Sequence, residues 1–184
     1  LLIAEARGDV IVFFDDDDYY APNYIDAMLE QMAGSDIAKL SNWFAYSTVH
    51  QQFFYWDTEV ADEHHYKVGK RSITIQNATL ADAHIRSLFT DGYGFSYVFS
   101  RKTALAVRFP DIDFGEDIAF ITEAKKQGHT IRHIRDEGGL ALHFIHGGNQ
   151  SQVFPQYRLP IFLIARIFPG LRETLHRQLF PFPL

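Results

Sequence analysis

The sequence contains no cysteine, which excludes disulfide bonds, thiolate metal sites and cysteine nucleophiles, and which fits a reducing compartment. The apolar run at Ile161–Ile167 is far shorter than the ~20 residues of a membrane-spanning helix. The first residues include neither an initiator methionine nor a basic segment, so we do not expect them to form a signal peptide. With a net charge of −6 and no basic stripe interleaved with aromatic residues, the sequence predicts no nucleic-acid partner.

The composition is that of a folded globular protein, since 47% of the 184 residues are hydrophobic and 22% are charged. We therefore expect one compact domain or a large part of one, in the cytoplasm or at the inner face of a membrane. The first residues, up to Gly8, are typical of the tail of a helix already under way. For that reason we expect the chain to be a fragment.

Hydrophobic patterning predicts an α/β fold. Val10–Phe14 is a continuous apolar run, which is typical of a strand buried on both faces in a parallel sheet. After Pro22, the spacing of Ile25, Met28, Leu29 and Met32 predicts a helix that ends at Gly34. Further strands are expected within residues 37–60, 66–76, 95–100, 130–134 and 140–151, and further helices at 79–89, 102–107 and 116–127.

Four consecutive aspartates, Asp15–Asp18, follow the Val10–Phe14 run directly. Carboxylates this close raise one another's pKa unless a cation or hydrogen-bond donors stabilise them. Mg²⁺ and Mn²⁺ take oxygen ligands, so Asp15, Asp17 and Asp18 form a candidate metal and nucleotide motif. In an extended segment Asp15 and Asp17 would face one side and Asp16 the other. The alternative is a solvated acidic turn.

A second candidate site is Glu116 and Asp117, which follow Gly115 at the start of a predicted helix. The helix dipole there favours the ionised carboxylate. An ionised carboxylate at the edge of a cleft can act as a general base, although a depressed pKa would limit its strength. The alternative is ordinary capping of the helix.

A third candidate is the strand and loop from Leu142 to Ser151, which carries His143 and His146 before two glycines. In a strand these two histidines would point to opposite faces, so we do not expect both to ligate one metal. One neutral imidazole could join the carboxylates, and the glycines would let backbone approach a phosphate. The alternative is that both histidines are structural or surface residues.

A fourth candidate is the turn Gly92–Tyr93–Gly94, because glycines beside aromatic rings suit a loop that lies against a sugar. Trp43, Trp56 or Tyr93 could supply the stacking face. The alternative is an ordinary turn next to the core.

The order of these segments resembles that of the inverting GT-A glycosyltransferases of family 2. Gly8–Pro22 resembles their "GDxIxFxDxDDxxxP" segment. That family then has a glycine- and aromatic-rich acceptor segment, a "GED" at a helix start, and a strand that ends in "HGGNxS". Here Asp91–Ser96, Gly115–Asp117 and His146–Ser151 match these segments in the same order. The resemblance covers about residues 1–151 and implies a GT-A-like (Rossmann-like) mixed sheet flanked by helices.

The resemblance also implies an activity, which is transfer of a sugar from a nucleotide-diphosphate sugar to a saccharide or glycoconjugate hydroxyl with inversion, as in the synthesis of cell-envelope polysaccharide. It implies donor binding by Asp15 and Asp17, and a Mn²⁺ or Mg²⁺ ion held by Asp17, Asp18 and His146, with His143 as the alternative histidine. Asp117 corresponds to the catalytic base and Glu116 shapes the same site. Acceptor binding is expected at Gly92, Tyr93, Gly94 and Trp56.

The family's first half, which holds the nucleotide base, would precede residue 1, so we expect this chain alone to bind the donor poorly and to be inactive. We expect residues 1–154 to be the C-terminal portion of the GT-A domain and residues 155–184 to be a helical apolar extension. That extension packs on the domain or, alternatively, makes peripheral contact with a membrane surface. The competing functions are a non-catalytic glycan-binding module with the same core and a metal-dependent phosphohydrolase.

Overall fold

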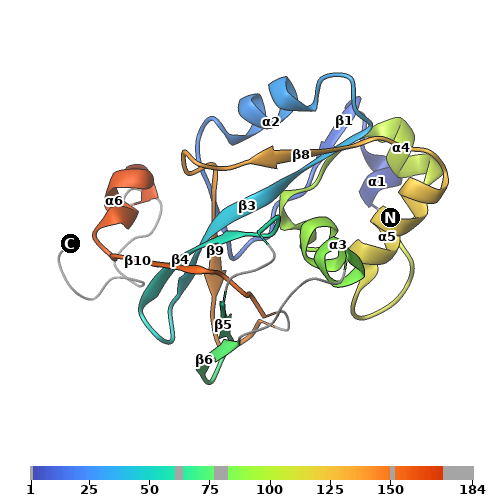
Figure 1. Cartoon of the computed structure of the whole chain (residues 1–184). Helices are drawn as coiled ribbons and strands as arrows, with labels where there is room; N and C mark the ends of the chain where they lie inside the picture. The colour runs from blue at the N-terminus through green and yellow to red at the C-terminus, as the bar shows by residue number, and fades with distance from the viewer. Residues whose placement is uncertain (1, 61–63, 77–82, 150–151, 172–184) are drawn as a thin grey trace.

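The computed structural model describes residues 2–60, 64–76, 83–149 and 152–171 (Figure 1). The helices are α1 (Leu2–Glu5), α2 (Tyr24–Met32), α3 (Ala83–Asp91), α4 (Arg101–Ala106), α5 (Glu116–Lys126) and α6 (Leu163–Ile167), with a 3₁₀ turn η1 (Gly94–Ser96). The strands are β1 (Val10–Val12), β2 (Tyr19–Tyr20), β3 (Ile37–Ser47), β4 (Gln52–Asp57), β5 (His65–Val68), β6 (Ile73–Gln76), β7 (Val98–Ser100), β8 (Ile131–Arg135), β9 (Ala141–Ile145) and β10 (Tyr157–Leu159).

Strand β3 is the centre of an eight-stranded mixed sheet. One edge of β3 pairs antiparallel first with β7 and then with β4. The other edge pairs parallel with β8 and then with β9. Helix α2 lies over the β8 side of the sheet, while α1, α3, α4 and α5 gather at the end away from α6 (Figure 1). The α/β mixed sheet flanked by helices is therefore confirmed.

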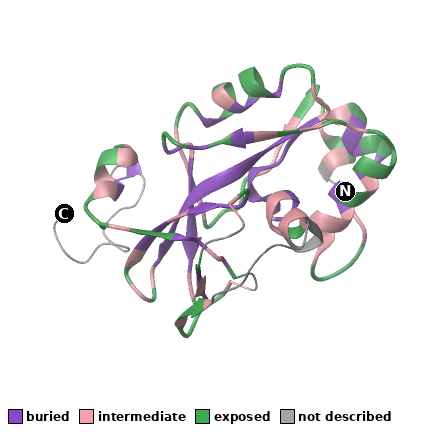
Figure 2. Cartoon of the chain, viewed as in Figure 1, coloured by how far each residue is buried: buried purple, intermediate pink, exposed green. Residues whose placement is uncertain are grey.

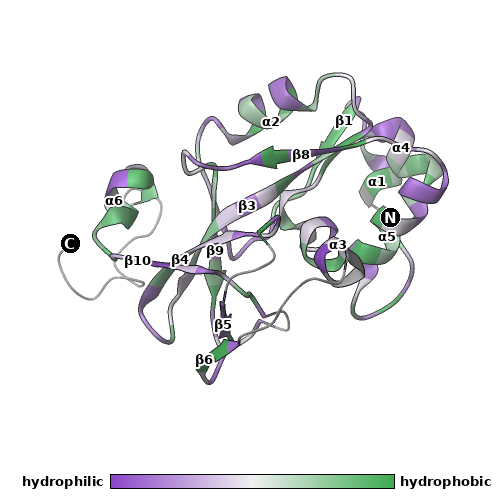
Figure 3. Ribbon diagram, in the orientation of Figure 1, coloured by the Kyte–Doolittle hydropathy of each residue, from purple (hydrophilic) through white to green (hydrophobic). Residues whose placement is uncertain are grey.

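All eleven residues of β3 are buried, although Figure 3 shows much of this strand in pale or hydrophilic colours and Figure 2 shows it in the buried colour. The hydrophilic colours arise because β3 carries four buried polar side chains, those of Lys39, Ser41, Asn42 and Ser47. A buried polar group is costly unless it is hydrogen-bonded. The polar positions of β3 therefore need partners from neighbouring segments.

The prediction for the first strand was wrong in two respects. Only Val10–Val12 forms a strand, and it pairs antiparallel with β7. Val10 and Phe14 are 37% and 48% exposed, so the run is not buried on both faces. Among the described residues β1 has a partner on one edge only. A continuous apolar run thus indicated a strand but not its burial.

Helix α2 follows a short strand that the sequence did not indicate, because β2 lies between the aspartate loop and the helix and pairs with β9. The helix buries Tyr24, Met28 and Met32, which lie at spacings of four residues. Ile25 and Leu29 are 44% and 39% exposed, so only part of the apolar pattern faces the core. The short β2–β9 pairing fixes one end of the aspartate loop against β9.

The described C-terminal segment, residues 155–171, adds β10 antiparallel to β4 and the short helix α6. Ile164 and Phe168 are buried in an aromatic cluster with Phe44 and Tyr19. Phe162 is 64% exposed. No helix within the described ranges is long and apolar enough to cross a membrane. The division at residue 154 and a peripheral membrane contact stay predictions.

Candidate active site

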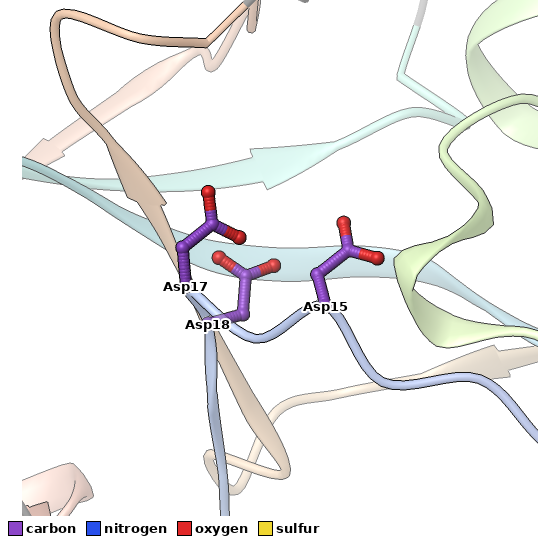
Figure 4. A group of neighbouring side chains, drawn as sticks. All are labelled: Asp15, Asp17 and Asp18. Carbon is purple, nitrogen blue, oxygen red and sulfur yellow. The ribbon is translucent and has the colours of Figure 1, made fainter.

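The aspartate loop folds as a tight turn between β1 and β2. The Asp18 amide donates to the Asp15 carbonyl oxygen at 3.3 Å, which closes the turn. One carboxylate oxygen each of Asp15, Asp17 and Asp18 lies within 4.8 Å of the others. In Figure 4 the three carboxylates converge on the same side of the loop. The predicted grouping of these three is present, although a turn produces it and not the alternation of an extended segment.

Asp18 is the buried member of this aspartate cluster, with a side chain that is 0% exposed. One of its oxygens accepts from the Phe144 amide at 2.8 Å, and the other lies 2.8 Å from Nδ1 of His143. Burial disfavours the charged imidazole, but the neighbouring Asp18 carboxylate outweighs burial and raises the pKa of His143. Asp18 thus enters the cluster with its orientation fixed by β9.

Asp17 is the more open member, and its Oδ2 lies 2.7 Å from Nε2 of His146. The Gly148 amide donates to Nδ1 of the same imidazole at 3.0 Å. Nδ1 must therefore be unprotonated, so the proton of a neutral His146 is on Nε2 and is donated to Asp17. In this arrangement His146 orients Asp17.

The expectation that His143 and His146 face opposite sides was wrong, since both side chains contact the aspartate cluster. Strand β9 ends at Ile145, and the chain turns at Gly147 and Gly148. The alternation of a strand therefore does not extend to His146. Ser151, the last residue of the matched loop, lies outside the described residues.

Asp15 is the member that faces the cleft. Desolvation of its carboxyl group and repulsion by Asp18 raise the pKa of Asp15 to about 6. Its backbone amide donates to the Tyr20 hydroxyl at 3.0 Å, and that hydroxyl donates to the Phe95 carbonyl at 2.7 Å. The loop is thereby tied to the segment that follows the Gly92–Gly94 turn.

The aspartate cluster fits a hard divalent cation by its chemistry, because carboxylate oxygens are the preferred ligands of Mg²⁺ and Mn²⁺. Three carboxylates with oxygens within 4.8 Å of one another repel each other, and the raised pKa of Asp15 is one sign of that repulsion. A bound cation would relieve it. The Asp18 oxygens are already hydrogen-bonded, so the more available ligands are Asp15 and Asp17.

Asp117 lies in the first turn of α5, which begins directly after Gly115, a residue with a left-handed φ of 83°. Its Oδ2 accepts from the Gly94 amide at 2.7 Å. A Cβ at Gly94 would lie 2.2 Å from Oδ1 of Asp117, so only glycine allows this approach. The Asp91–Ser96 segment and the start of α5 are therefore packed together.

The expected depression of the Asp117 pKa was wrong. Burial of the carboxyl group raises its pKa, and the charge of Glu116 adds to this effect. The Gly94 amide and Lys39 oppose it without cancelling it. A raised pKa makes the carboxylate a stronger base than an ordinary surface aspartate.

One cleft of about 730 Å³ is lined by both Asp15 and Asp117. Glu116, Gly92, Tyr93, Gly94 and His143 also line it. Much of the remaining wall is aromatic and was not predicted, with Phe13, Phe89, Phe95, Phe109, Phe114 and Phe154. Phe114 is 70% exposed and directly precedes the GED triplet, which is the one sequence signal that could have marked it.

The aromatic residues of the predicted acceptor segment divide into two groups. Tyr93 lines the cleft and has a left-handed φ of 62°, which is uncommon for a residue with a side chain. Trp43 and Trp56 are 0% exposed, and their rings lie 5.4 and 5.0 Å from that of Tyr93. Trp56 thus supports Tyr93 from within the core and offers no face to a ligand in this structure.

Comparison with known proteins bears on the first half of the chain. Residues 1–88 match the model of the family described as Glycosyl transferase family 2. No curated protein matches the chain. The matched residues include the aspartate loop and β3, and a GT-A-like fold agrees with the mixed sheet described above. The resemblance to the family 2 glycosyltransferases is therefore confirmed over residues 1–88.

Proposed function

We propose that the chain transfers a sugar from a nucleotide-diphosphate sugar to a hydroxyl group of a saccharide or glycoconjugate acceptor, with inversion at the anomeric carbon and with Mn²⁺ or Mg²⁺. The observation that carries the proposal is that Asp15, from the aspartate cluster, and Asp117 line one cleft. Transfer requires a site for an anionic leaving group and a base for the acceptor. The cleft offers a group suited to each role.

Asp117 is the proposed base. It takes the proton of the acceptor hydroxyl as the oxygen attacks the anomeric carbon, and the bond from that carbon to the diphosphate breaks on the opposite side. Because the acceptor oxygen attacks the face opposite the leaving diphosphate in a single displacement, the configuration inverts. The Gly94 amide holds Oδ2 of Asp117 at 2.7 Å and leaves Oδ1 for the incoming hydroxyl. Glu116, also in the cleft, shapes the same site.

The proposed cation site is made by Asp15 and Asp17, with Asp18 completing the cluster. A bound cation would supply positive charge to the leaving diphosphate. His146 holds Asp17 in place through Nε2, and His143 holds Asp18 in place through Nδ1. Acceptor binding is assigned to Tyr93, Gly92 and Gly94, with Trp56 as support beneath Tyr93.

The test is turnover of a panel of nucleotide-diphosphate sugars by the full-length protein, with Mn²⁺ and with EDTA. Release of the nucleoside diphosphate together with sugar transfer or sugar hydrolysis, lost in EDTA, supports the proposal. Release of inorganic phosphate without sugar cleavage would indicate a phosphohydrolase instead. Glycan binding without any turnover would indicate a non-catalytic module.

A further inference from the structure

Lys39 is a lysine in the middle of the sheet, and its side chain is 0% exposed. Lysine is almost never fully buried unless it is paired, because the ammonium group loses its hydration. It lies on the central strand β3, between the rings of Trp43 and Tyr97, whose centroids are 6.0 and 5.7 Å from Nζ. No sequence pattern marks Lys39 as special, and the proposed transfer step does not use it.

The partners of Lys39 are backbone atoms of the predicted acceptor segment. Its Nζ donates to the carbonyl oxygens of Thr90 and Gly92. These two carbonyls flank Asp91, whose carboxylate forms an ion pair with Lys125 and a hydrogen bond with His133. The start of the turn is thus held from beneath by Lys39 and from the side by Lys125 and His133.

The turn leads directly to the proposed base. Gly94, two residues after the Lys39-bound carbonyl of Gly92, donates its amide to Asp117. At Gly92 itself a Cβ would lie 2.5 Å from the Leu88 carbonyl oxygen, so the backbone is packed closely against α3 there. The Tyr97 hydroxyl adds a brace by donating to the Asp91 carbonyl at 2.5 Å. A shift of the turn would therefore displace the amide that holds Asp117.

We propose that Lys39 is a positioning residue, which fixes the turn at residues 90–94 from within the core and so holds the Gly94 amide against Asp117. This inference rests on the proposed function for its meaning, but the contacts do not depend on that function. Replacement of Lys39 by an apolar residue leaves two carbonyl oxygens without their donor. The contacts with β3 that remain include the rings of Tyr93 and Phe95 against Trp43, and these apolar contacts offer the two carbonyls no donor.

The charged groups that act on Lys39 include Asp91, Asp117 and Lys125, and those that act on Asp117 include Glu116, Lys39 and Asp15. Burial lowers the pKa of Lys39 to about 7, against the pull of the two aspartates. Hydrogen bonds from a charged donor are roughly twice as strong as those from a neutral one. Deprotonation of Lys39 therefore loosens the turn and also removes a cation that favours the Asp117 carboxylate.

The experiment is a pH titration of the unmodified protein by NMR, followed at the Lys39 side chain, the Gly94 amide and the Asp117 carboxyl carbon. We expect the Gly94 and Asp117 signals to shift with the midpoint at which Lys39 titrates, wherever that midpoint falls. Signals of Gly94 and Asp117 that ignore the titration of Lys39 would overturn the proposal. The measurement needs no donor or acceptor, so absence of transferase activity would not affect it.

Two variants provide a second readout. Lys39→Met is expected to speed hydrogen exchange of the Gly94 amide about tenfold, since the turn loses its charged donor. Lys126→Met is the matched control, because the Lys126 side chain is 70% exposed and its ion-pair partner in the described part of the chain is Glu123 on the same helix. Equal exchange at Gly94 in both variants would contradict the proposal. Should Lys39→Met not fold, the titration of the unmodified protein decides alone.

Discussion

Asp117→Asn is expected to lower the rate of sugar transfer by the full-length protein by roughly 10²–10⁴-fold, because the amide cannot take the proton of the acceptor hydroxyl. The asparagine oxygen still accepts from the Gly94 amide, so the local structure is kept. The measurement is the transfer rate with the donor found by the panel. Asp111→Asn is the matched control. This substitution removes the same charge from an exposed residue in the loop before α5.

The same substitution is expected to leave the free energy of unfolding unchanged or to increase it. Burial raises the pKa of Asp117 above its ordinary value of 3.8. A carboxyl group with a raised pKa in the folded state stabilises the fold most below its unfolded pKa, and this contribution is lost as the pH rises through the folded pKa. At neutral pH the charged Asp117 is thus a cost that asparagine removes. A large loss of stability in Asp117→Asn would show that Asp117 is mainly structural.

Asp17→Asn is expected to weaken Mn²⁺ binding at least about tenfold, because the aspartate cluster loses one of its two available ligands. Asp16→Asn is the matched control. It removes the same charge from the neighbouring residue, whose side chain is not part of the cluster. Isothermal titration of Mn²⁺ into the two variants measures the difference. Equal affinities would mean that the loop attracts cations by net charge alone.

Much of the site could be predicted from the sequence because its parts are close in the chain. Asp15, Asp17 and Asp18 lie within four residues, so almost any turn brings them together. The pairing of this cluster with Asp117 in one cleft depends on the whole sheet, and only the resemblance to family 2 linked them. The hydrophobic pattern predicted that strands form, but it did not predict that β1 pairs antiparallel with β7.

The errors at particular residues have physical causes. His146 was assigned to a strand that ends one residue earlier, so its direction was wrong. Trp56 was assigned to the cleft because aromatic residues serve cores and sugar sites alike, and it is buried. The pKa of Asp117 was expected to follow the helix dipole, whereas burial outweighs it. Lys39 was overlooked because a lysine in a sequence is ordinarily a surface residue.

The most direct test of the single-displacement site is the anomeric configuration of the first sugar product, read by ¹H NMR before mutarotation. Water can serve as the acceptor, so the donor that the panel identifies is sufficient. We expect a product of inverted configuration, and we expect its formation to be lost in Asp117→Asn. A product of retained configuration would contradict this expectation, because retention requires a covalent intermediate or front-face attack that a base at Asp117 does not provide.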